Sequence, residues 1–112
     1  MLKKALMAAS TKPIILTILS RGEDYGYNII QRAKDLSGGA LEWSDGMLYP
    51  VLQRLERENL ISSRWQISEE GRHRKYYTIT PSGRDALAAE IAQWRTMIQA
   101  LNSIWKPLLQ AE

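Results

Sequence analysis

The chain contains no cysteine and only one histidine, and both scarcities exclude kinds of functional site. Without cysteine there is no disulfide framework and no thiolate metal site, which agrees with a reducing cytoplasm. His73 stands alone in a basic segment, and a catalytic base needs a positioned nucleophile or a substrate pocket. Neither metal-ligand spacing nor a phosphate-binding glycine loop occurs. We therefore expect a cytoplasmic protein without catalytic residues, cofactor or metal.

Long apolar runs are missing as well. No stretch approaches the roughly eighteen apolar residues of a membrane-spanning helix. Residues 1–9 resemble the charged start of a signal peptide, but residues 10–13 interrupt the apolar run and no small-residue cleavage pattern follows. We therefore expect neither export nor a membrane partner.

The length and composition are those of a single globular domain. The chain has 112 residues and a hydrophobic content of 45%, enough for one core. Its net charge of +3 permits nucleic-acid binding without requiring it. The local distribution is more informative, because basic residues concentrate at Arg72, Arg74 and Lys75.

The first half of the chain predicts three helices in succession. A helix over residues 2–20 is followed by one over 25–36, for which Asp24 is the expected cap. Residues 37–39 form a Ser-Gly-Gly break, and residues 41–43 suggest a short strand. With a further helix after residue 43, this order is the one expected of a helix-turn-helix.

That third helix begins at Ser44 or Asp45, whose short side-chain oxygen can accept from the free N–H groups of the first turn. One face is apolar and carries Met47, Leu48, Val51, Leu52 and Leu55. The opposite face suits base edges and phosphates in a DNA groove, and it carries Gly46, Tyr49, Pro50, Gln53 and Arg57. An ordinary amphipathic surface helix would have the same pattern. Asn59 can take the left-handed conformation that ends a helix.

A β-hairpin is expected next, with strands over residues 61–67 and 75–79 and a link over 68–73. A hairpin after such a helix is a wing, and the cluster of Arg72, Arg74 and Lys75 favours contact with phosphates. The alternative is a solvated structural tip on which these cations pair with Glu69 and Glu70.

The last helix opens with Thr80 as cap and Pro81 at its first position. Its apolar residues alternate at gaps of four and three, a heptad seam that calls for a partner helix, and they are Leu87, Ile91, Trp94, Ile98, Leu101, Trp105 and Leu108. A globular core could absorb part of this stripe. Pro107 suggests fraying near the end.

Three segments together resemble the PadR family of transcriptional regulators. They are residues 46–56 with Leu60-Ile61, residues 71–80 with Gly83, and residues 15–30. The resemblance implies a mainly α fold with a small β-hairpin: a winged helix-turn-helix over residues 1–80 and a C-terminal dimerisation helix over 81–112, forming one unit. Asn59 and Met47 depart from the family pattern, which often has Gly and Thr there.

The same resemblance implies a dimeric, sequence-specific DNA-binding regulator, in all expectation a repressor, on a near-palindromic double-stranded operator. The DNA-contacting residues would be Ser44, Gly46, Tyr49, Pro50, Gln53, Arg54, Arg57, Arg72, His73, Arg74 and Lys75. The homodimer interface would be the heptad seam. Trp94, with Ile98, matches in position a tryptophan that lines an apolar cavity for planar aromatic effectors in the short multidrug-responsive branch. Trp94 could equally be a plain seam residue.

Two other classes of function stay open on the sequence. The fold could serve as a protein-interaction module that uses the face from Tyr49 to Arg57, or as a small-molecule-binding module built around Trp94. Salt-sensitive binding to duplex DNA would distinguish the regulator from both.

Overall fold

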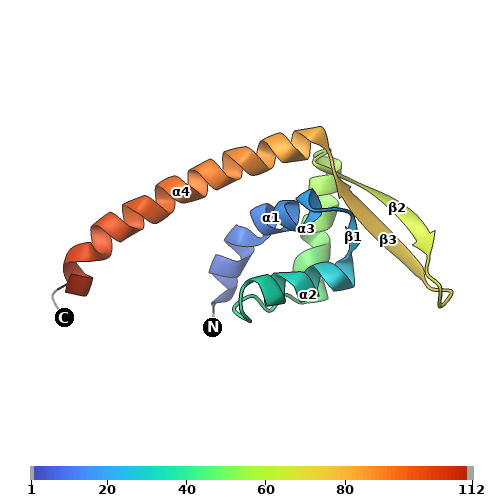
Figure 1. Ribbon diagram of the computed structural model, residues 1–112, viewed down its shortest axis with the longest axis horizontal. Coiled ribbons are helices and arrows are strands. Elements are labelled where there is room, and N and C mark those ends of the chain that lie inside the picture. The colour runs from blue at the N-terminus through green and yellow to red at the C-terminus, as the bar shows by residue number, and fades with distance from the viewer. Residues whose placement is uncertain (1, 111–112) are drawn as a thin grey trace.

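The computed structural model describes residues 2–110, and within them four helices accompany a small antiparallel sheet. Figure 1 shows the first three helices gathered into one cluster, from which the hairpin and the last helix project in opposite directions. In chain order the elements are α1 (Lys4–Ser20), β1 (Asp24–Tyr25), α2 (Gly26–Leu36), α3 (Asp45–Arg57), β2 (Ile61–Ile67), β3 (His73–Ile79) and α4 (Pro81–Gln110). The expected winged helix-turn-helix with a long C-terminal helix is confirmed.

The core lies where α1, α2 and α3 meet the base of the sheet. Each helix contributes its apolar stripe, as the 3.6-residue period of the sequence predicts. The fully buried side chains include Ile15, Leu16, Ile18 and Leu19 of α1, Ile29 of α2, Leu48, Leu52 and Leu55 of α3, and Ile61 of β2. The inner face of α3 is therefore committed to the core, and its outer face is left for other contacts.

The sheet contains a third strand that the sequence pattern did not indicate. Its order is β1-β3-β2, with Asp24 opposite Tyr77 and Tyr25 opposite Tyr76. The strand expected over residues 41–43 is wrong, because Leu41 and Trp43 are buried in the core without a strand partner. The two-residue β1 forms instead because its backbone lies beside the outer edge of β3.

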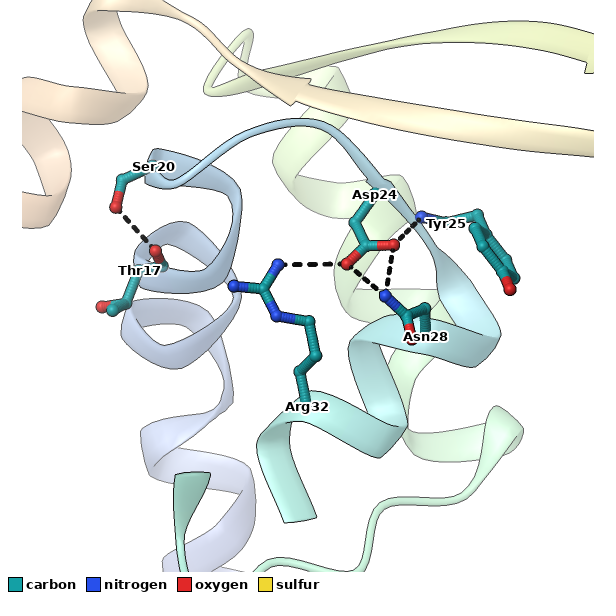
Figure 2. A network of polar contacts seen from close by, with 6 residues as sticks. All are labelled: Thr17, Ser20, Asp24, Tyr25, Asn28 and Arg32. Carbon is teal, nitrogen blue, oxygen red and sulfur yellow. Dashed lines mark hydrogen bonds and ion pairs between the residues drawn. The ribbon is translucent and has the colours of Figure 1, made fainter. Parts of the chain in front are cut away.

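Asp24 has a different role from the predicted one. The residue that precedes α2 is Tyr25, and its side chain does not cap the helix. The Asp24 carboxylate is buried, accepts from Tyr25 N at 2.9 Å and Asn28 Nδ2 at 2.8 Å, and pairs with Arg32 Nη1 at 3.1 Å (Figure 2). A buried charge must be paired and hydrogen-bonded. The network therefore joins β1 to the first two turns of α2.

Other element ends differ by a few residues from expectation. The helix predicted over 2–20 begins at Lys4, and β3 begins at His73 rather than at residue 75, because the Ser68–Arg72 turn is closed by backbone bonds. Pro107 does not end α4, which continues to Gln110. The predicted segment 81–112 also includes residues 111–112, and these lie outside the described residues, as does Met1.

Side chains cap the starts of α3 and α4, and the residues that follow α3 contact the start of α4. Ser44 caps α3 by accepting from Met47 N at 3.2 Å, and Asn59 ends the following turn at a φ of 60°. Thr80 caps α4 by accepting from Gly83 N at 2.9 Å, and its hydroxyl donates to the Asn59 carbonyl at 2.7 Å. All of these capping predictions are confirmed.

Most of α4 lies beyond the core. The molecule measures 59 × 28 × 21 Å, and its radius of gyration is 16.3 Å against about 13 Å for a compact domain of this length. An ion pair between Lys12 and Glu90, at 3.6 Å, joins α1 to the first half of α4. Among residues 2–110, no helix combines the length and apolar character needed to cross a membrane.

Gly83 allows α4 to start against the end of α3, and this gives a test of the junction. A Cβ at position 83 would collide with the Leu60 carbonyl oxygen and with Ile79 Cγ1. Gly83→Ala should lower the free energy of unfolding by about 3 kcal/mol, because the obstructing atom belongs to the backbone. Urea denaturation measures it. Ser82→Ala, at the exposed neighbouring position, should change it by less than about 0.5 kcal/mol, and equal effects would contradict the close approach.

Candidate nucleic-acid interface

A hollow of about 770 Å³ lies between α3, the start of α2 and the hairpin. Its lining combines aromatic and basic side chains with one amide, and no carboxylate belongs to it. The lining residues are Tyr25, Gly26, Tyr27, Tyr49, Gln53, Trp65, Arg72, His73, Arg74, Lys75 and Tyr77. Such a surface is suited to an anionic ligand that also presents apolar or planar groups.

The outer face of α3 is exposed, as predicted. The exposed residues of α3 are Asp45, Gly46, Tyr49, Pro50, Gln53, Arg54 and Arg57, with Ser44 just before the helix. The inner residues Leu48, Leu52 and Leu55 hold this face at the surface because they are buried completely. The Ser44 hydroxyl is occupied in part, since it accepts from Met47 N. Gln53 lines the hollow. Its amide forms no hydrogen bond with the part of the chain that the structure describes.

Tyr49 is more constrained than an ordinary surface tyrosine. Its ring lies directly over Gly26, so closely that a Cβ at position 26 would collide with the phenol oxygen. Burial raises the pKa of the Tyr49 hydroxyl, and the charge of Asp45 adds to the effect. The absence of a side chain at Gly26 therefore places the Tyr49 ring at the wall of the hollow.

The basic residues of the hairpin differ in their partners. Arg74 lies 4.5 Å from the centre of the Tyr25 ring and 4.0 Å from a carboxylate oxygen of Glu70. Lys75 pairs with Glu56 at 3.5 Å. Within residues 2–110, the Arg72 side chain has no ion-pair partner. The cations are thus only partly neutralised, and Arg72 is the most available of the three.

Glu56 connects α3 to the hairpin. Its partners are residues of the two strands and not its sequence neighbours Arg54 and Arg57. The Ser63 hydroxyl of β2 donates to its carboxylate, and Lys75 of β3 lies against the other oxygen. The reason is that Glu56 points toward the sheet, whereas Arg54 and Arg57 are exposed. This contact sets the position of the hairpin relative to the outer face of α3.

Tyr77 of β3 is buried and lines the hollow beside Lys75. Burial raises its pKa to about 12, and the nearby negative charge of Glu56 contributes. Tyr76, its neighbour, faces the other side of the strand and packs edge-on against Tyr25 with 5.5 Å between ring centres. The two tyrosines face opposite sides because successive side chains alternate along a strand.

The sequence did not indicate that four further aromatic residues line the hollow, namely Tyr25, Tyr27, Trp65 and Tyr77. For Trp65 a signal existed, because the two-residue period of β2 puts it on the same side as Ile61, which is core. For Tyr25 and Tyr27 none existed, since only the pairing of β1 with β3 brings the start of α2 beside the hairpin.

The residues predicted for dimerisation and for an aromatic effector lie elsewhere, on α4. Trp94 and Leu101 are half-buried, and Ile91, Ile98, Trp105 and Leu108 are exposed. Leu87 packs against the core. The hollow includes neither Trp94 nor Ile98. Figure 1 shows α4 running from the base of the hairpin in the direction opposite to the hairpin tip.

Comparison with known proteins agrees with this architecture. Residues 15–89 match the model of the family described as "Transcriptional regulator PadR-like family". Among curated proteins, the "Negative transcriptional regulator PadR" of Bacillus subtilis is 34% identical over 68% of this chain and 42% of its own length. The chain therefore spans under half of that relative.

Two solved structures are similar over nearly the whole chain. A transcriptional regulator from Clostridium thermocellum has a TM-score of 0.83 and 25% identity, covering 92% of this chain and 97% of its own. A PadR-like transcriptional regulator from Bacillus cereus has a TM-score of 0.77 and 30% identity, covering 97% of this chain and 100% of its own.

The seat of Tyr49 on Gly26 can be tested directly. Gly26→Ala should push the ring toward solvent, and the pKa of Tyr49 should then fall toward its ordinary value near 10, because burial is what raises it. Titration of ring-labelled tyrosine by NMR measures it. Gly46→Ala is the control on α3, the helix that carries Tyr49, since a Cβ at position 46 would meet only Ser44 Oγ at 3.9 Å. An unchanged pKa in the Gly26 variant would contradict the contact.

Proposed function

Because this chain belongs to the PadR-like family of transcriptional regulators, we propose that it binds duplex DNA through α3 and the β2–β3 hairpin. The observation that carries the proposal is the hollow between these elements, which has four basic residues and no carboxylate in its lining. Membership of a family of transcriptional regulators also supports the expectation that the chain is not an enzyme.

In the proposed complex α3 lies in the major groove, which admits an α-helix and displays a distinct pattern for each base pair. Gln53 is the base-reading residue, because its exposed amide can bond bidentately to adenine. Gly46 and Pro50 leave room for the backbone to approach, and Tyr49 adds a hydroxyl at the edge of the hollow. Arg54, Arg57 and the Ser44 region face phosphates.

The hairpin is the second DNA-binding element. Arg72, His73 and Arg74 lie at the tip and meet the phosphates on the side of the adjoining minor groove. Lys75 contributes less, because Glu56 already neutralises much of its charge at 3.5 Å. Phosphate contacts hold the protein on the duplex, whereas the base edges met by α3 provide the sequence preference.

A homodimer built on α4 completes the proposed regulator. Outside the core α4 carries Ile91, Trp94, Ile98, Leu101, Trp105 and Leu108, and these apolar side chains leave a long stripe open to solvent. Gaps of four and three match the seam of two packed helices. A second copy of this chain is the occupant that the repeating seam favours.

A two-fold dimer recognises a near-palindromic operator, because its two α3 helices enter successive turns of the major groove. Repression is the proposed outcome, and the "negative" regulator named in Bacillus subtilis supports it. In this arrangement Trp94 and Ile98 meet their copies near the two-fold axis, where a planar aromatic effector could stack between the rings.

Two variants separate base reading from phosphate contact. Gln53→Ala should narrow the difference in binding free energy between operator and random duplex by about 1–3 kcal/mol, because a bidentate base contact is lost. Neutralising Arg72 and Arg74 together should instead weaken both complexes equally and flatten the log–log salt slope by roughly two units per wing. Fluorescence anisotropy over a salt series measures both effects. Salt-insensitive binding, or none, would refute the proposal.

The dimer is tested by a charge in the seam. Leu101→Asp should convert the dimer to monomer at micromolar concentration, because an unpaired carboxylate in an apolar interface costs several kcal/mol. Analytical ultracentrifugation gives the mass. Gln99→Asp adds the same charge to an exposed position off the seam and should leave the dimer intact. A wild-type protein that sediments as a monomer would rule out this assembly.

A further inference from the structure

The core-facing side of the hairpin extends beyond the core. In the β2–β3 register Ile61 lies opposite Ile79, Trp65 opposite Lys75 and Ile67 opposite His73. Residues two apart share a face, so Trp65 and Ile67 point to the same side as Ile61. Ile61 is 1% exposed, but Trp65 and Ile67 are 67% and 61% exposed, because the helices end before the hairpin does.

Trp65 is therefore a large apolar side chain on a surface that also carries basic groups. It lines the hollow together with Gln53 of α3 and with Arg72, His73 and Lys75 of the hairpin. Its strand neighbour across the ladder is Lys75, so the indole and an ammonium group project from adjacent positions. Most of this side chain stays open to solvent among residues 2–110.

We propose that Trp65 is a DNA-contacting residue, whose indole packs on the deoxyribose and base edges of the duplex held between α3 and the hairpin. The inference rests on the proposed function and extends it to an apolar contact that no charge pattern predicts. Sugar rings and base edges in the minor groove supply apolar surface between phosphates, and apolar side chains are commonly used there.

Charge complementarity selects DNA over a protein partner as the occupant. A duplex brings phosphates and apolar sugar surface together at a regular spacing, and the hollow presents cations and an indole side by side with no lining carboxylate. An acidic protein partner could also pair with the cations. It would not explain why the Trp65 ring lines the same hollow as Gln53 and Tyr49, which lie on the face of α3 proposed to read bases.

The salt dependence of binding tests this contact. An apolar contact releases no condensed counterions, so Trp65→Ala should lower the affinity for duplex DNA about tenfold and leave the log–log salt slope unchanged. Trp65→Phe should restore most of the affinity. The tryptophan fluorescence of the protein should also change on DNA binding. The change can be assigned to Trp65, because the other tryptophans lie in the core (Trp43) or on α4 (Trp94 and Trp105).

The controls keep the result specific. Leu36→Ala removes an exposed apolar side chain of α2 that does not line the hollow, and it should bind DNA as the wild type does. Thermal unfolding of Trp65→Ala should match the wild type, since the ring is largely in solvent. Wild-type affinity in Trp65→Ala, or a loss accompanied by a flattened slope, would overturn the inference while leaving DNA binding by α3 in place. Failure of the wild-type protein itself to bind any duplex would overturn the proposed function and this inference together.

Discussion

The close approach of Gly83 to the Leu60 carbonyl is the constraint on which the rest of the arrangement depends. At this junction the end of α3, the first residue of β2, the last residue of β3 and the first turn of α4 meet. Thr80 N donates to the Leu60 carbonyl at 3.0 Å, and the Thr80 hydroxyl donates to Asn59. Because a backbone oxygen leaves no room for a side chain, the direction in which α4 leaves the domain is tied to the orientation of α3.

A second connection sets the angle between α3 and the hairpin. Glu56 reaches from α3 to Ser63 of β2 and to Lys75 of β3, so one carboxylate joins the helix to both strands. The charge that it neutralises lies on the proposed DNA-binding surface. The hairpin therefore gives up part of its electrostatic attraction for DNA in return for a fixed position, and Arg72 carries more of the remaining attraction.

The two ends of the molecule differ in what they leave uncovered. Around α3 and the hairpin the open surface is basic and aromatic, whereas along α4 it is apolar. Large exposed apolar surfaces mark sites of association. In the proposed dimer, the junction shared by α3 and α4 would link a change in the pairing of the α4 helices to the spacing of the two α3 helices. Such a link is the route by which the proposed effector near Trp94 would alter DNA binding.

The sequence by itself determined the local elements. Helical periodicity predicted which face of α3 is buried, and the caps at Ser44, Asn59 and Thr80 were readable because capping depends on the few residues beside each helix end. Family resemblance added the winged arrangement, which the structure confirms. The DNA-contacting residues and the dimer seam stay predictions, and the exposure of most of these residues in the structure supports them.

Only the tertiary structure decided which residues meet across the chain. Asp24 looked like a helix cap, but its burial beside β3 requires Arg32 and Asn28 as partners. Glu56 lies between Arg54 and Arg57 in the sequence, but it faces the sheet and pairs with Lys75. Trp65 shares the strand face of the buried Ile61, but the helices stop short of it. In each case the outcome depended on which distant element lies beside the residue or ends before reaching it, and no local spacing encodes that.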